Sequence, residues 1–178
     1  MTDTRPTAFD SEFLYYATSD GWGRWAPGEP EPEETGQGDL FDVSSSNRMF
    51  QLDDRRFSID QPFFNVVYEV PGRGGGLSAD GNYAFTRSPD DGRVLVYDTR
   101  SGDLVDVSPP DPDRVIDVVL DPPLAVTYIT VDQDAFPQQE GSDSNRVQGE
   151  IVTCQLDDGE CEPAVTLVLD SEAPILAR

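Results

Sequence analysis

Residues 77–107 read LSADGNYAFTRSPDDGRVLVYDTRSGDLVDV, and this stretch decides the fold. It holds three short runs rich in β-forming residues: Tyr83–Thr86, Val94–Tyr97 and Leu104–Val107. A turn sequence ending in glycine comes before each run: Ala79–Gly81, Pro89–Gly92 and Thr99–Gly102. Glycine adopts positive φ without steric cost, and Asp or Ser side chains bond the backbone of a turn, so each cluster reverses the chain. The stretch therefore predicts an antiparallel meander.

The same order of strand, glycine and strand occurs three times along the chain. The first strand reads FLYYATS at residues 13–19, NYAFTRS at 82–88 and LAVTYIT at 124–130. The next strand follows Gly38, Gly92 or Gly149, which are 54 and 57 residues apart. Self-similarity at a period near 50 is typical of stacked supersecondary units, and four-stranded units indicate propeller blades.

Leu77–Val107 resembles a blade of the WD40-like and TolB-like β-propeller repeats. In those repeats Ser-Pro-Asp-Gly precedes the second strand and Tyr-Asp-x-x-x-Gly lies between the third and fourth. Here Ala79 replaces the proline, and the Trp-Asp and Gly-His pairs of true WD40 repeats are absent. The resemblance implies a single all-β domain over residues 1–178, with about three four-stranded antiparallel blades at approximately 8–54, 55–110 and 111–169. A β-sandwich with similar hairpins is the alternative fold.

Two polar segments are expected to be loops outside the blades. Residues 20–38 contain several prolines, glycines and glutamates, which disfavour a strand because proline removes a ladder donor and glycine costs entropy. Residues 132–146 form a second polar insertion. Loops of this kind commonly carry recognition, so both are expected to bind a partner.

The charge of the chain is strongly negative, with 35 acidic and 12 basic residues and a formal net charge of −23. Such a field repels phosphate backbones and anionic lipids, so neither nucleic-acid binding nor membrane association is expected. The acidic residues suit a solvated surface, adaptation to high salt or, as a sharper interpretation, mimicry of a nucleic-acid charge array. The sequence shows no stretch of eighteen apolar residues and no signal peptide.

Residues able to perform catalysis or to bind a metal are sparse. The chain has no His, which removes the commonest general base and metal ligand. Carboxylates occur in adjacent pairs within turns, such as Asp90 and Asp91, and not as the spaced pair that glycoside hydrolysis needs. No cofactor is expected. Asp132, Asp134 and Asp143 offer hard oxygen ligands for Ca²⁺, although no twelve-residue calcium loop surrounds them.

Trp22 and Trp25, with Arg24 between them, are the candidate binding residues, and they lie among glycines and prolines. One interpretation folds both rings back over the edge of a blade, because large aromatic side chains are mostly buried. The other leaves them exposed as an anchor for a protein partner or a sugar ring, because Trp dominates interface hot spots.

Cys154 and Cys161, the two cysteines, face each other if residues 156–159 form a four-residue turn. Directly opposed strand residues lie close enough for a disulfide, which would indicate an oxidising, extracytoplasmic compartment. Two buried thiols, or half of a metal site, are the alternatives.

Together these features predict a non-catalytic protein-binding or structural module built from propeller blades. A carbohydrate-binding or carbohydrate-active propeller using Trp22 and Trp25 is the alternative. Because propellers normally close a ring of about four to eight blades, a protein partner or self-association is expected to complete the ring.

Overall fold

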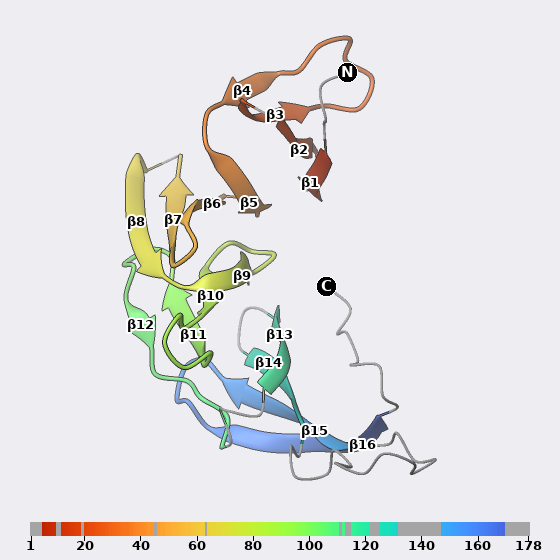
Figure 1. Ribbon diagram of the computed structural model, residues 1–178, viewed down its shortest axis with the longest axis vertical. Coiled ribbons are helices and arrows are strands. Elements are labelled where there is room, and N and C mark those ends of the chain that lie inside the picture. The colour runs from red at the N-terminus through yellow and green to blue at the C-terminus, as the bar shows by residue number, and fades with distance from the viewer. Residues whose placement is uncertain are drawn as a thin grey trace.

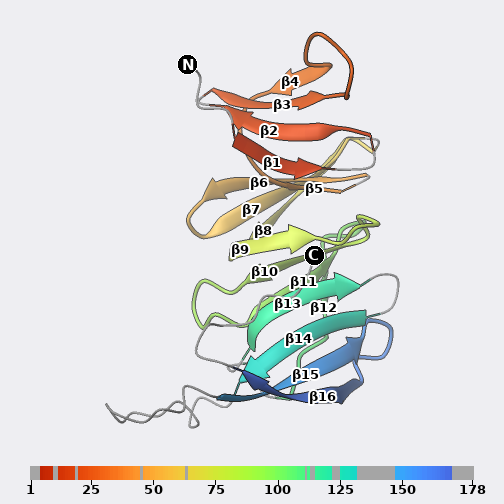
Figure 2. The same ribbon diagram turned by 90° about the vertical axis from the view of Figure 1, so that its right-hand side faces the viewer.

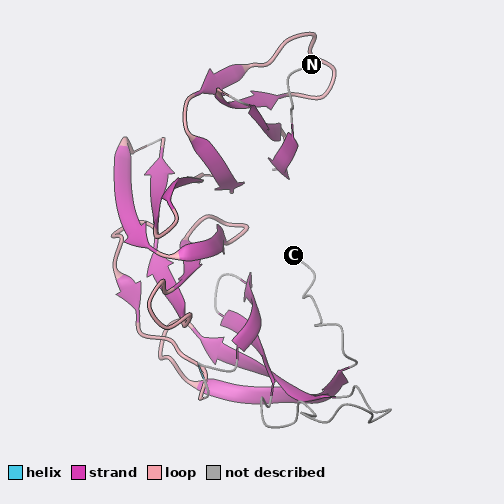
Figure 3. Ribbon diagram, in the orientation of Figure 1, coloured by secondary structure: helices cyan, strands magenta, loops and turns pink. Residues whose placement is uncertain are grey.

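The described residues fold into antiparallel strands joined by turns and loops. A computed structural model describes residues 5–9, 12–18, 20–44, 46–62, 64–110, 112, 115–121, 125–131 and 147–169. Their strands form four separate sheets of four strands each. These residues contain no helix, and so none that could cross a membrane (Figure 3). The sheets follow one another along an open arc in Figure 1, and Figure 2 shows them stacked in chain order.

Each sheet is built from four consecutive strands. The first sheet contains β1 (Arg5–Phe9), β2 (Leu14–Thr18), β3 (Gly21–Trp25) and β4 (Glu34–Gly36). The second contains β5 (Asp39–Val43), β6 (Arg48–Asp53), β7 (Arg56–Gln61) and β8 (Val66–Pro71). The third contains β9 (Arg73–Leu77), β10 (Tyr83–Arg87), β11 (Val94–Asp98) and β12 (Leu104–Val105). The fourth contains β13 (Val115–Asp121), β14 (Ala125–Val131), β15 (Val147–Gln155) and β16 (Cys161–Leu169).

The first strand of a sheet lies on the inner side of the arc (Figure 1). There β1 contacts β5, β5 contacts β9, and β13 contacts β10. The apolar core is divided into three clusters, one at each junction between neighbouring sheets. They centre on Tyr15, Trp22 and Leu40, on Phe57 and Ile59, and on Val126 and Tyr128. Four sheets that pack face to face along an arc are propeller blades, and they exclude the β-sandwich alternative.

The expected number of about three blades is wrong, because the structure has four. The expected boundaries 8–54 and 55–110 also differ from the structure: the sheets span residues 5–36, 39–71, 73–105 and 115–169. Residues 39–52, which the expected boundaries placed at the end of the first blade, form the hairpin of β5 and β6 that opens the second sheet. The strands that the sequence did not predict are β1, β3, β4, β7 and β9.

These strands were missed because local composition conceals them. Residues 20–38 were expected to form a loop, yet they contain β3 and β4, and the prolines at 27, 30 and 32 lie in the connection between these two strands. In β3, Gly23 leaves the space that a Cβ would take to the ring of Tyr16, so the glycine serves cross-strand packing. In β7, polar residues alternate with Phe57 and Ile59, which are both fully buried.

The predicted disulfide is confirmed. Cys154 and Cys161 are paired across β15 and β16 with 3.9 Å between their Cα atoms, and they are joined by a disulfide bond. The second expected recognition loop, 132–146, and the calcium candidates Asp132, Asp134 and Asp143 lie outside the described residues.

Candidate binding site between the second and third sheets

Trp22 lies in the core between the first two sheets. Its side chain is 5% exposed and packs near Tyr15 and Phe50, at centroid distances of 6.3 and 6.2 Å. The guanidinium of Arg48 lies over the indole ring at 4.5 Å. The expectation that the ring folds back over a blade therefore describes Trp22 well, and its ring does not offer an open stacking surface.

Arg24 and Trp25 are held by contacts within the first sheet. The Arg24 guanidinium lies 4.3 Å from the centroid of Phe13 and 3.6 Å from a carboxylate oxygen of Glu33. The indole N–H of Trp25 donates to the carbonyl of Glu29 at 2.6 Å, in the proline-containing turn. Trp22 and Trp25 are three positions apart on β3, and because this spacing is odd their side chains point to opposite faces of the sheet. The three predicted residues thus do not form one shared surface.

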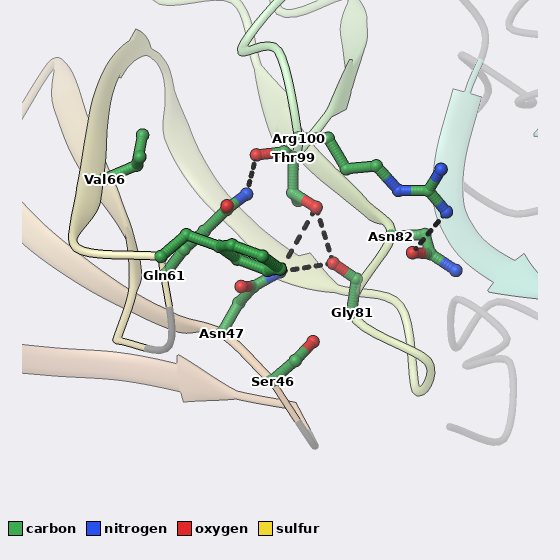
Figure 4. Close-up of a pocket in the computed structure, with 9 residues that line it drawn as sticks. Ser46, Asn47, Gln61, Val66, Gly81, Asn82, Thr99 and Arg100 are labelled. Atoms are coloured by element: carbon green, nitrogen blue, oxygen red, sulfur yellow. Dashed lines mark hydrogen bonds between the residues drawn. The ribbon is translucent and has the colours of Figure 1, made fainter.

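A cavity of about 460 Å³ opens instead between the second and third sheets. Four turns form its walls: β5–β6, β7–β8, β9–β10 and β11–β12 (Figure 4). Its lining residues are Ser46, Asn47, Gln61, Phe64, Val66, Gly81, Asn82, Thr99 and Arg100. The volume lies within the range of small-ligand and side-chain pockets.

The β9–β10 turn is shaped by the sequence that decided the fold. The Ser78 hydroxyl donates to Asp80 Oδ1 at 2.7 Å, and the backbone N–H of Asn82 donates to the same oxygen at 3.0 Å. Burial of the Asp80 carboxyl raises its pKa, but these bonds and one from the Asn82 amide hold the pKa below its usual value. Gly81 has φ of +73°, a conformation that L side chains rarely adopt.

A buried polar network joins this turn to the second sheet. The Asn47 amide nitrogen donates to the Gly81 carbonyl and, at 3.1 Å, to Thr99 Oγ1. Thr99 Oγ1 donates to the same carbonyl at 2.6 Å, and the Gln61 amide nitrogen donates to the Thr99 carbonyl. Asn47, Gln61 and Thr99 are each 5% exposed or less. The network fixes the relative position of three turns and leaves the cavity rigid (Figure 4).

The rim of the cavity is chemically different from its floor. Phe64 is 74% exposed, an unusual state for a phenyl ring. Arg100 donates to Asn82 Oδ1 at 3.0 Å and has no ion pair with any residue in the described part of the chain. Tyr68 donates its hydroxyl hydrogen to the backbone carbonyl of Arg100 at 2.5 Å, which anchors the β11–β12 turn. An exposed ring and a guanidinium beside buried amides form a surface suited to recognition.

The lining of this cavity contains only a few kinds of chemical group. Its lining groups are amides, hydroxyls, one guanidinium and apolar side chains, and no carboxylate is among them. The described residues also contain no cluster of three or more metal-ligating side chains.

Sequence reasoning did not identify these residues. Asn47 and Thr99 are 52 positions apart, and each looks like an ordinary turn residue in isolation. The available signal was Gly81, which ends the turn sequence before β10 and would also be needed for close approach by another sheet.

Comparisons with known proteins identify only the fold. No protein-family model matches the chain, and no curated protein matches it. The solved structure of Hsv2p from Kluyveromyces lactis is similar with a TM-score of 0.57 and 12% identity, over 97% of this chain and 75% of that one. KlHsv2 with loop 6CD replaced by a Gly-Ser linker gives a TM-score of 0.54 and 13% identity, over 94% of this chain and 72% of that one. These neighbours are β-propellers. The finer resemblance to WD40-like and TolB-like repeats stays a prediction.

Proposed function

We propose that the chain is a non-catalytic protein-binding module built from propeller blades. The observation that carries this proposal is the cavity between the second and third sheets, where Phe64 is exposed beside buried amides. A rigid pocket with an exposed aromatic rim is typical of protein interfaces. The absence of carboxylates from the described lining supports binding in preference to acid–base chemistry.

The carbohydrate alternative has less support. It required Trp22 and Trp25 to present their rings together, but Trp22 is buried beneath Arg48 and Phe50. Sugar stacking needs an accessible aromatic face, so this pair does not supply the platform.

Site-specific photo-crosslinking tests the proposal. Benzoylphenylalanine placed at Phe64 should form an adduct with one discrete protein in cells of the source organism, and the purified partner should reproduce it. The same group at Leu104, which is also exposed (58%) but does not line the cavity, should not form this adduct. Equal labelling from both positions, or no protein adduct at Phe64, would contradict the proposal.

A second copy of the chain is proposed as the partner that completes the ring. Four blades from each of two copies give eight, the upper end of the usual range for propellers. The far face of the first sheet carries Leu14 and Tyr16, which are only partly buried and therefore available for contact. Native mass spectrometry at high protein concentration should show a dimer, and a strictly monomeric protein would rule this assembly out.

A further inference from the structure

The floor of the cavity offers two hydrogen-bond acceptors. Asn47 and Gln61 use their amide nitrogens in the network, and no described residue donates to Oδ1 of Asn47 or to Oε1 of Gln61. Both side chains are at least 95% buried. Neither oxygen is among the buried unpaired polar atoms of the described residues, so each can accept a hydrogen bond from an occupant that brings an N–H or O–H group.

The walls of the cavity favour a ring. Phe64 and Val66 provide apolar surface, and Phe64 exposes most of its ring. Contact between two aromatic rings has a more favourable free energy than their buried area alone would give. A guanidinium also binds the face of an aromatic ring. Arg100 supplies such a guanidinium, since among the described residues this group donates only to the uncharged amide of Asn82.

We propose that this cavity binds a Trp or Tyr side chain of a protein partner. The ring contacts Phe64, Val66 and the Arg100 guanidinium, while its N–H or O–H donates to an amide oxygen of Asn47 or Gln61. Trp and Tyr are the side chains that combine a large apolar ring with one donor at its edge. This assignment rests on the proposed function, because it names the anchor by which a protein partner would bind.

The charge distribution argues against an anionic occupant. Arg100 is the one cation of the lining, and the same turns carry Asp80, Asp98 and Asp103. The chain as a whole has a net charge of −23. The negative field would repel an acidic sugar or another carboxylate, whereas it would not repel a neutral ring that carries a hydrogen-bond donor.

Titration of the full chain with N-acetyltryptophanamide tests the assignment. The side-chain amide signals of Asn47 and Gln61 in ¹⁵N NMR spectra should shift and saturate. The 1-methylindole analogue lacks the ring N–H, and loss of one hydrogen bond should weaken its binding about tenfold. N-acetylphenylalaninamide, which has no donor on its ring, should be weakened to a similar extent.

Three variants locate the binding. Phe64→Ala should weaken N-acetyltryptophanamide binding about tenfold, and Arg100→Ala about threefold, by loss of ring contacts. Both side chains are exposed, so the fold is retained. Leu104→Ala, at an exposed site outside the cavity, is the matched control and should bind like the parent chain.

The possible outcomes separate the assignment from the proposed function. Absence of saturable binding, equal binding of the 1-methyl analogue, or equal loss in Leu104→Ala would overturn the aromatic anchor. If the Phe64 photo-crosslink to a protein nevertheless persisted, the binding function would stand with another anchor. Binding of galacturonate in place of the aromatic amide would overturn the assignment in favour of a sugar ligand.

Discussion

The third sheet is joined to its two neighbours in different ways. Its junction with the second sheet combines an apolar cluster, including Phe57 and Ile59, with the hydrogen-bonded turns around Asn47 and Thr99. Its junction with the fourth sheet is a larger, continuous apolar cluster around Val126 and Tyr128. Both junctions bury side chains to a similar degree. The polar contacts of the first form a buried network of several side chains, whereas across the second the Arg87 guanidinium donates to the carbonyls of Val115 and Ile116.

This difference explains where the cavity lies. Apolar packing stabilises two faces without specifying the position of individual turns, because it is non-directional. Hydrogen bonds between buried groups require defined geometry, and here they join three turns in fixed relative positions. Of these two junctions, the second–third junction therefore presents the shaped site, and the third–fourth junction contributes mainly stability.

The largest effect is expected from Gly81→Ala. A Cβ at Gly81 would meet the hydroxyls of Ser44 and Ser46 in the second sheet, and φ there is +73°. Strain at positive φ and overpacking together should lower the free energy of unfolding by about 3 kcal/mol, measured by chemical denaturation. Gly92 has a similar φ of +77° but nothing within 4 Å of a Cβ, so Gly92→Ala should cost about 1 kcal/mol. Equal losses would show that the close approach of the two sheets is unimportant.

Reduction of the disulfide tests the other junction. Cys154 belongs to the apolar cluster between the third and fourth sheets, and its bond to Cys161 closes a short turn. Chain-entropy arguments give about 2.5 kcal/mol of stability for a loop of this length. Hydrogen exchange should accelerate in β15 and β16 after reduction, while β7 and β10 keep their protection. Uniform acceleration across all four sheets would instead indicate that the junctions unfold together.

Thr99→Val removes a hydroxyl from the polar network while nearly preserving shape. Thr99 is 1% exposed, and its Oγ1 both donates to the Gly81 carbonyl and accepts from Asn47. We expect a loss of about 1.5 kcal/mol in the free energy of unfolding. Thr130→Val in the fourth sheet is the control, because its hydroxyl makes a longer bond of 3.4 Å to the Glu150 carbonyl. A cost at Thr130 as large as that at Thr99 would remove the distinction between the junctions.

The sequence predicted β10, β11 and β12 of the third sheet, because the turns that precede them are determined locally. Asp80 is bonded by Ser78 and Asn82, both within two positions of it, so the pattern is visible in a short window. The first sheet was not predicted as four strands, because β3 depends on the ring of Tyr16 crossing Gly23. That contact follows from pairing two strands, and the composition of residues 20–38 does not reveal it.

The candidate site was beyond single-sequence reasoning for a related reason. Its floor joins Asn47 to Thr99 and Gln61 to Thr99 over 52 and 38 positions. Trp22 and Trp25 attracted the prediction because their side chains are large, and their surroundings in sequence gave no indication of the buried neighbours. The cavity residues were missed, and Trp22 and Trp25 were chosen instead, because both sites depend on contacts between residues far apart in the sequence.

The smallest effect, and one of opposite sign, is expected from Tyr128→Phe. Tyr128 is fully buried in the cluster between the third and fourth sheets, and its hydroxyl has no hydrogen-bond partner there. Removing an unsatisfied buried hydroxyl avoids its desolvation cost and retains the ring, so the variant should be about 1 kcal/mol more stable near pH 7. A similar change at Tyr97, whose hydroxyl is 3.4 Å from the Pro71 carbonyl, should bring little gain. Destabilisation by Tyr128→Phe would mean that the hydroxyl contributes to this junction.

The pH dependence of stability gives a second measure of the same hydroxyl. Burial raises the pKa of Tyr128, so the folded chain keeps the phenol neutral where the unfolded chain ionises it. Below about pH 10, the pKa of the phenol in the unfolded chain, this group leaves the free energy of unfolding unchanged. Above that pH the free energy of unfolding falls by up to about 1.4 kcal/mol per pH unit. Tyr128→Phe should therefore show a shallower alkaline decline in denaturation experiments between about pH 9 and 11. Some decline should remain, because burial also raises the pKa of Tyr97. An unchanged slope would show that the phenol ionises in the folded chain, and the apolar junction would then be open to solvent on that side.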